Sequence, residues 1–169
     1  MFLRHVIEFH TKFGLKNGDT NSTVCKNLTE DEIRFRLGFL FEELFETVDA
    51  CGLDLNPQVK NSLIESINSA HINLNKYDEL EIIDGLLDLI YVSFGTLLLK
   101  GLSEVQIREH QLEIQRANMS KERSLENDSR SKRNHSLDVV KPEGWKGPDH
   151  EKIMDENIEI NFRNTSNEK

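Results

Sequence analysis

Apolar side chains recur at helical spacing through most of the first 120 residues, between short polar interruptions. The first helix is predicted over residues 2–14, where four apolar side chains share one face: Phe2, Val6, Phe9 and Phe13. Gly14, Asn17 and Gly18 then open a polar loop.

Two helices with recognisable start signals follow this loop. Thr29-Glu30-Asp31-Glu32 is a capping-box pattern and predicts the start of a helix that ends at Gly52. Asn56-Pro57 supplies an N-cap and a first-turn proline, which predicts a third helix that ends near Ala70.

The fourth predicted helix, over residues 78–100, is the most apolar segment of the chain. Because it is apolar nearly all round, we expect it at the centre of the fold. Gly101 ends it, and Ser103 with Gln106 caps a fifth helix that extends to about Ser120.

Helical periodicity ends after this fifth segment. Residues 122–138 are almost all polar, which predicts a mobile loop. Apolar and turn residues return around Trp145, whereas residues 156–169 are polar and are predicted to be a disordered tail. We therefore expect an all-α fold: an antiparallel bundle of four to five helices with an irregular C-terminal arm, forming a single domain over residues 1–155.

Composition narrows the choice of partners and compartment. The net charge of −9 argues against nucleic acid and anionic membranes as partners. Cys25 and Cys51 lack metal-site or redox-motif spacing and are predicted to be free thiols. The longest charge-free run, residues 89–99, is too short to span a bilayer, so we expect a soluble cytoplasmic protein. A bundle this small exposes much apolar surface as a monomer, which predicts a homodimer or homotetramer.

Two acidic pairs lie inside otherwise apolar predicted helices. Glu43 and Glu46 are three residues apart, and Glu81 and Asp84 repeat that spacing, with Asp88 one turn further on. Residues three or four apart share a helix face, so each set presents its carboxylates together. Carboxylates beside a core-facing stripe repel each other and lose hydration unless a cation compensates. Oxygen ligands of this kind suit Mg²⁺ or Mn²⁺.

The acidic residues have two other interpretations, a solvated helix face and a di-iron centre. Each pair can belong to a solvated helix face that happens to be acidic. A di-iron centre would need a His three positions after a Glu on each of two helices, and no Glu in this chain is followed by His at that spacing. Oxygen-preferring metals are therefore favoured over redox chemistry.

The order of these motifs resembles the all-α nucleoside triphosphate pyrophosphohydrolases, a MazG-like superfamily that includes dimeric dUTPases and phosphoribosyl-ATP pyrophosphohydrolases. That family carries Glu-x-x-Glu on one helix and Glu-x-x-Asp on a later one, which here are residues 43–46 and 81–84. The resemblance covers residues 5–155 and includes the segments 9–14, 84–92, 117–121 and 140–145. One departure is that 34 residues separate the two motifs, more than is usual.

The resemblance implies a role for each acidic residue. Glu43, Glu46, Glu81 and Asp84 become the ligands of Mg²⁺, for which Mn²⁺ can substitute. Glu42 joins Glu43 in catalysis, either as an outer ligand or as the acceptor of the water proton, against the alternative of a surface role. Asp88 becomes a further ligand or a group that orients the substrate.

The resemblance also implies substrate-binding residues near the C-terminus. Asn118 and Lys121 sit one turn apart and correspond to nucleotide and phosphate contacts, although a frayed helix end is an alternative. Lys141 and Lys146 flank Trp145 and belong either to an arm that closes over a nucleotide or to a segment that packs against the bundle.

The function implied is Mg²⁺-dependent hydrolysis of a nucleoside or deoxynucleoside triphosphate, or a related nucleotide, to the monophosphate and pyrophosphate. The rival from another class is a non-catalytic helical interaction or regulatory module of the same fold.

Overall fold

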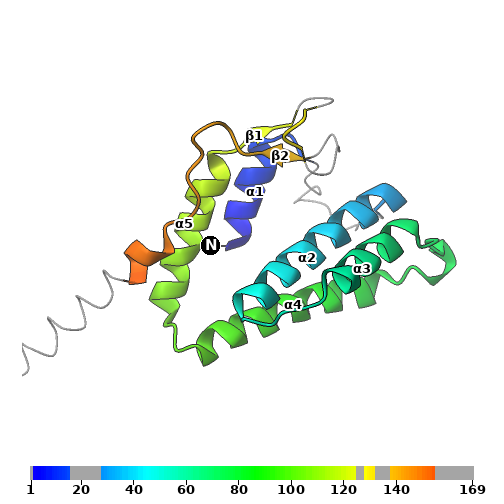
Figure 1. Ribbon diagram of the computed structural model, residues 1–169, viewed down its shortest axis with the longest axis horizontal. Coiled ribbons are helices and arrows are strands. Elements are labelled where there is room, and N and C mark those ends of the chain that lie inside the picture. Colours follow the sequence, from blue (N-terminus) through cyan, green and yellow to red (C-terminus); the bar gives the residue numbers. More distant parts are fainter. Residues whose placement is uncertain (1, 16–27, 125–127, 132–137, 155–169) are drawn as a thin grey trace, which may run out of the picture. The chain divides into compact units, whose positions relative to one another are not determined.

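The computed structural model describes residues 2–15, 28–124, 128–131 and 138–154. It is mostly helical, which confirms the predicted all-α class with a C-terminal arm (Figure 1). In chain order the elements are α1 (Phe2–Lys12), α2 (Glu30–Ala50), α3 (Pro57–Ser69), the 3₁₀ turn η1 (Leu74–Lys76), α4 (Glu79–Leu99), α5 (Glu104–Met119), β1 (Glu122–Arg123) and β2 (Val139–Val140).

The predicted helix starts are confirmed by their capping bonds. At α2, the Thr29 amide donates to Glu32 Oε2 at 2.9 Å and the Glu32 amide donates to Thr29 Oγ1 at 3.2 Å. Asn56 Oδ1 accepts from the Gln58 amide at the start of α3. Ser103 caps α5 in the same reciprocal way as Thr29 caps α2. Each bond satisfies a backbone donor that the first helical turn leaves unpaired.

The chain divides into two compact units, and the boundary falls inside α4. The first unit contains residues Met1–Ser22 and Asp88–Lys169. There α1 packs on α5, and Gln115 Nε2 donates to the His5 carbonyl at 3.2 Å. Phe13, Ala117 and Val140 are the buried apolar residues among the described part of the chain, so the small core lies where α1, α5 and β2 meet.

The second unit contains Thr23–Leu87 and is built on the packing of α2 against α3. The Arg34 guanidinium donates to the carbonyls of Ile67 at 3.2 Å and Ala70 at 2.6 Å, which ties the end of α3 to α2. Lys60 forms an ion pair with Asp49 on the same face. Neither α2 nor α3 contains a buried residue, so the packing of α2 on α3 is held by partly exposed side chains such as Arg34 and Lys60.

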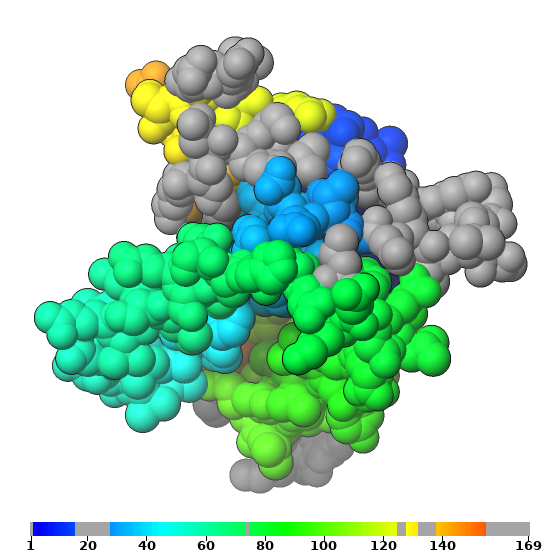
Figure 2. Space-filling model, turned by 90° about the vertical axis from the view of Figure 1, so that its right-hand side faces the viewer, coloured from blue at the N-terminus to red at the C-terminus, as the bar shows by residue number. Residues whose placement is uncertain are grey.

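The expectation that the fourth helix lies at the centre is wrong for a single chain. Helix α4 contains no buried residue, and its green surface is open to solvent in Figure 2. Within the first unit, the Phe94 ring of α4 approaches the Phe2 ring of α1 edge-on, with the centroids 6.3 Å apart. By length and composition alone, α4 is also apolar enough to cross a membrane.

The segment predicted as a mobile loop, residues 122–138, starts with strand β1 and is followed directly by strand β2. The sequence did not reveal this two-stranded sheet. Strands β1 and β2 pair antiparallel, with Glu122 opposite Val140. Ser124 and Asp138 are buried beside the sheet, where the Ser124 amide donates to the Asp138 carbonyl at 3.1 Å. The rest of the loop prediction, for residues 125–127 and 132–137, lies outside the described residues, as does the predicted tail.

Candidate functional site

The first acidic pair lies on the accessible surface of α2. Glu43 and Glu46 are exposed, whereas Glu42 is partly buried. The side chain of Thr47 donates to the Glu43 carbonyl at 2.8 Å, as is common for Thr inside a helix. The carboxylates of the pair therefore face water, from which a hydrated cation could approach them.

The second acidic pair lies in the first turns of α4. Asp78 caps this helix, because its Oδ1 accepts from the amides of Leu80 at 3.1 Å and Glu81 at 3.2 Å. Glu81, Asp84 and Asp88 are all exposed. Acidic side chains near a helix N-terminus are stabilised by the helix dipole, so part of this charge is explained by the helix itself.

The two pairs do not form a ready metal-binding group in the single chain. Among the described residues, which include all four predicted ligands, no group of three or more His, Cys, Asp or Glu side chains is close enough to hold a metal ion. The donor chemistry fits Mg²⁺, since all the candidate ligands are carboxylates. Because no group of three ligands is formed, the assignment of the four carboxylates as metal ligands stays a prediction.

Two of the predicted substrate-binding residues, Lys121 and Lys141, lie beside Trp145 in the first unit. Lys121 Nζ and Lys141 Nζ lie 5.7 and 4.6 Å from the centre of its ring. Asn118, partly buried, sits one turn before Lys121 at the end of α5. The Trp145 indole donates to the Ala117 carbonyl at 3.0 Å, which holds the ring against the helix. Two cations beside a fixed aromatic ring offer both charge and a stacking surface to a nucleotide.

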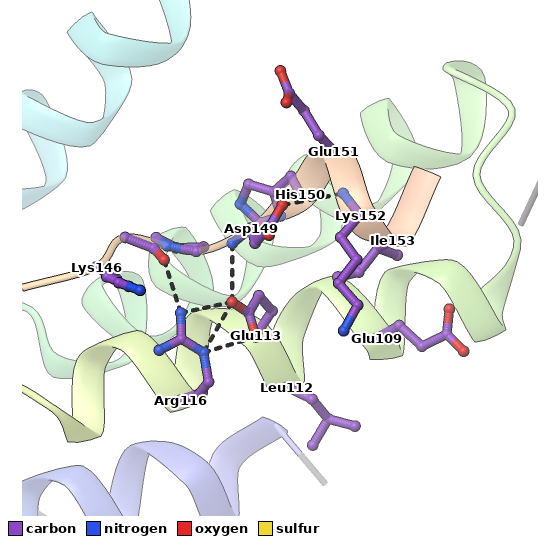
Figure 3. Close-up of a pocket in the computed structure, with 12 residues that line it drawn as sticks. Glu109, Leu112, Glu113, Arg116, Lys146, Asp149, His150, Glu151, Lys152 and Ile153 are labelled. Carbon is purple, nitrogen blue, oxygen red and sulfur yellow. Dashed lines mark hydrogen bonds and ion pairs between the residues drawn. The ribbon is translucent and has the colours of Figure 1, made fainter. Parts of the chain in front are cut away.

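A pocket of about 1030 Å³ lies between α5 and the arm (Figure 3). Glu113 is central to it, because its carboxylate accepts from Arg116 at 2.7 to 2.9 Å and from the Asp149 amide at 2.9 Å. Arg116 also donates to the Gly147 carbonyl at 2.8 Å. Lys146, predicted to bind substrate, lines this pocket.

These contacts change the charge properties of Glu113. The hydrogen bonds from Arg116 and from the Asp149 amide lower the pKa of the Glu113 carboxyl to about 2, so it is ionised throughout the neutral range. Four acidic side chains and three basic ones line this pocket, so the ion pair of Glu113 with Arg116 is one of several opposite charges that meet there. The hydrogen bonds of Glu113 to the Asp149 amide and of Arg116 to the Gly147 carbonyl hold the arm on α5.

A pair of histidines joins the arm to α5 at the far end of the same pocket. His110 Nδ1 and His150 Nδ1 lie 3.0 Å apart, and their rings meet edge to face. Burial and the neighbouring His150 lower the pKa of His110, while Glu109 acts in the opposite direction. One nitrogen must donate and the other accept, so this contact requires at least one neutral imidazole.

The sequence analysis did not identify these arm contacts. The spacing of Glu113 and Arg116, one turn apart on a predicted helix, was a readable signal for their ion pair. No sequence signal connects His110 with His150 across 40 positions. The arm is seen to pack on α5, which is the second of the two alternatives for Lys141 and Lys146, and its closure over a nucleotide stays a prediction.

Comparison with known proteins identifies the family to which most of this chain is similar. A family model described as phosphoribosyl-ATP pyrophosphohydrolase matches residues 6–118, two thirds of the chain. No curated protein and no solved structure matches this chain. The matched range spans both acidic pairs and ends at Asn118.

Proposed function

This chain belongs to the phosphoribosyl-ATP pyrophosphohydrolase family, and on that premise we propose that it hydrolyses a nucleoside or deoxynucleoside triphosphate, or a related nucleotide, to the monophosphate and pyrophosphate. The family match confirms the resemblance drawn from the sequence. The observation that carries the proposal is that the matched range includes both acidic motifs, residues 43–46 and 81–84.

Four carboxylates would hold the metal ion: Glu43, Glu46, Glu81 and Asp84. They supply only oxygen donors, which Mg²⁺ prefers and Mn²⁺ accepts. When bound, the ion would offset phosphate charge and lower the pKa of water beside the reacting phosphorus. A metal ion held by carboxylates of both helices would link α2 to α4 and would stabilise the fold.

Proton transfer falls to the acidic residues of α2. Glu42 precedes Glu43 by one position, so its side chain lies about 100° further round the helix and need not bind the same ion. We assign Glu42 to accept the proton of the attacking water, with Glu43 both holding metal and orienting that water. A carboxylate is an effective general base only within hydrogen-bond reach of the water, about 2.6–3.2 Å.

The nucleotide would be held by residues from α4, α5 and the arm. Asn118 lies in the last turn of α5, Lys121 follows the helix, and the ammonium groups of Lys121 and Lys141 both lie near the ring of Trp145. Lysine ammonium groups offset phosphate charge as the substrate binds. We also assign Asp88 and Lys146 to substrate binding, Asp88 by orienting the sugar or the metal-bound phosphates.

A nucleotide panel tests the proposal. Pyrophosphate release should be measured for ribo- and deoxyribonucleoside triphosphates and for a phosphoribosyl adenine nucleotide, with Mg²⁺, with Mn²⁺ and with a chelator. The proposal expects release from at least one nucleotide, only when a divalent ion is present. Release in chelator would show that the carboxylates do not act through a metal.

The rival function is a non-catalytic interaction or regulatory module. The observation in its favour is that no metal-binding group of three side chains forms among the described residues of the chain alone. The same panel separates the two functions, because a module releases pyrophosphate from none of the nucleotides. We propose a cytoplasmic location, since the net charge of −9 disfavours anionic membranes and Asp84 and Asp88 disfavour insertion of α4.

A further inference from the structure

The last turn of α5 is held by a side chain from another helix. This turn carries Asn118 and is followed by Lys121, the two residues assigned above to nucleotide binding. Its final carbonyl, that of Met119, accepts from the ammonium of Lys12, which lies 107 positions earlier at the end of α1. The last carbonyls of a helix have no partner within it, so Lys12 supplies a hydrogen bond that α5 itself cannot make.

Lys12 has a second contact that holds its ammonium in place. Its Nζ lies 4.9 Å from the centre of the Phe13 ring, and Phe13 is buried where α1, α5 and β2 meet. The ammonium is therefore attracted both to this ring and to the Met119 carbonyl. Two such contacts favour one side-chain position over the many that an exposed lysine samples.

The end of α1 is held in return by a cation that follows α5. The guanidinium of Arg123, on β1, donates to the Phe13 carbonyl. Gly14 leaves room for it, because a Cβ built on Gly14 would lie only 2.7 Å from Arg123 Nη1. Helices α1 and α5 pack side by side (Figure 1), and their C-terminal ends are thus joined twice. We call Lys12 and Arg123 the reciprocal caps.

The segment held by the reciprocal caps contains an amide that is available to a ligand. Asn118 is partly buried, and its side chain has no hydrogen-bond partner within the described part of the chain. Its backbone carbonyl accepts from the Lys121 amide at 3.2 Å, which links the two residues. A side-chain amide offers both donors and an acceptor. Groups that are already ordered bind a ligand without the further cost of being fixed.

We propose that Lys12 and Arg123 are positioning residues for the nucleotide, which fix the end of α5 so that Asn118 and Lys121 meet the substrate in one arrangement. This inference rests on the function proposed above and adds α1 to its substrate site. Neither cap needs to touch the nucleotide. If the end of α5 frayed, the substrate would have to order it, and that cost would raise KM. The carboxylates proposed to activate water lie on α2 and α4, so kcat should change much less.

Steady-state kinetics test the role of Lys12. Lys12→Met removes the ammonium and keeps an unbranched side chain, whereas Lys12→Arg keeps a cationic donor. Lys100→Met is the matched control, because it removes the same charge from an exposed lysine just after α4. With the nucleotide that wild type hydrolyses fastest, Lys12→Met should raise KM about 3- to 12-fold, the effect of losing one hydrogen bond. Its kcat should stay near the wild-type value, Lys12→Arg should recover most of the loss in KM, and Lys100→Met should behave as wild type.

Hydrogen exchange tests the positioning without hydrolysis. The amides of Ser120 and Lys121 each donate to a carbonyl of α5 at 3.2 Å, so their exchange reports fraying of this end. Lys12→Met should speed the exchange of both amides by about the same factor as it raises KM, with helical circular dichroism unchanged. Lys100→Met should leave their exchange at the wild-type rate.

A double variant tests whether Arg123 acts through Lys12. Arg123→Met should speed exchange of the Leu15 amide, which donates to the His10 carbonyl at 2.9 Å at the end of α1. Because Lys12 lies at that end, KM should rise as well. Lys12→Met combined with Arg123→Met should then raise KM by less than the product of the two single effects, since both act on the same contact.

The possible failures can be told apart. An unchanged KM in Lys12→Met, in an active protein, would overturn the positioning role and leave the proposed function standing. Wild-type exchange at Ser120 and Lys121 in that variant would overturn it as well, and so would an equal rise in KM in Lys100→Met. A wild-type chain that hydrolyses none of the nucleotides would refute the proposed function itself, and this assignment would be lost with it.

Discussion

Replacing Trp145 with Phe should loosen the C-terminal arm without unfolding the chain. The indole of Trp145 donates to the Ala117 carbonyl at 3.0 Å, and Phe removes this donor while it keeps an aromatic ring. The ring is partly buried and lies beside Lys121 and Lys141, so a ring at this position is retained as their packing surface. The substitution therefore isolates one hydrogen bond.

The surroundings of Ala117 set the size of the effect. Its buried carbonyl also accepts from Ser120, through the hydroxyl at 2.7 Å and the amide at 3.3 Å, so losing the indole does not leave it unpaired. The cost should be that of one neutral hydrogen bond, about 0.5–1.5 kcal/mol, rather than the larger cost of an orphaned acceptor. The equilibrium constant for arm opening should then rise about 2- to 12-fold.

Hydrogen exchange monitored by mass spectrometry measures this opening. The amides of Trp145 and Asp149 are informative, because they donate to the Pro142 carbonyl and to Glu113 in the docked arm. Trp145→Phe should speed their exchange by that factor, while exchange in α3 stays at the wild-type rate. Trp145→Ala serves as the comparison and should speed exchange at least tenfold further, since it also removes the ring. Wild-type exchange in Trp145→Phe, or equal exchange in both variants, would refute this account of the anchor.

Four other predictions follow from the sites described above. Glu46→Gln and Asp84→Asn should each lower turnover about 100-fold or more with the fold intact, because each removes charge from the metal ligands; wild-type rates in steady-state assays would reject the assignment. Millimolar Mg²⁺ should stabilise the chain by about 2.7 kcal/mol at a hundredfold excess over Kd, and thermal melts in NaCl of equal ionic strength should shift less. Because the docked state lowers the pKa of His110 below 6.5, docking should be strongest above pH 6.5 and weaken as pH falls below it; this slope in hydrogen exchange should flatten in His150→Gln. Truncation after Val140, which keeps the buried strand β2, should leave a folded protein that binds Mg²⁺ but has a lower kcat/KM, and an unchanged value would make the rest of the arm dispensable.

The acidic pairs and the cluster around Trp145 were predicted from the sequence to different degrees. The acidic pairs on α2 and α4 follow from spacing alone, because residues three apart on any helix share a face. Whether the pairs meet in one metal site could not be predicted this way, since it depends on how α2 and the start of α4 pack. The cluster around Trp145 was predicted as a set of residues, but its hydrogen bond to Ala117 was not.

The sequence by itself determined the helices, because their signals are local. Thr29, Asn56 and Ser103 each satisfy backbone donors within three residues, so the starts of α2, α3 and α5 follow from neighbouring side chains alone. Only the tertiary structure decided where these helices lie. It placed the arm on α5 through the contact of His110 with His150, and it left α4 uncovered although its composition is that of a central helix. The reason is that burial depends on which surfaces meet across long stretches of chain, whereas apolar periodicity states only that a surface must be covered.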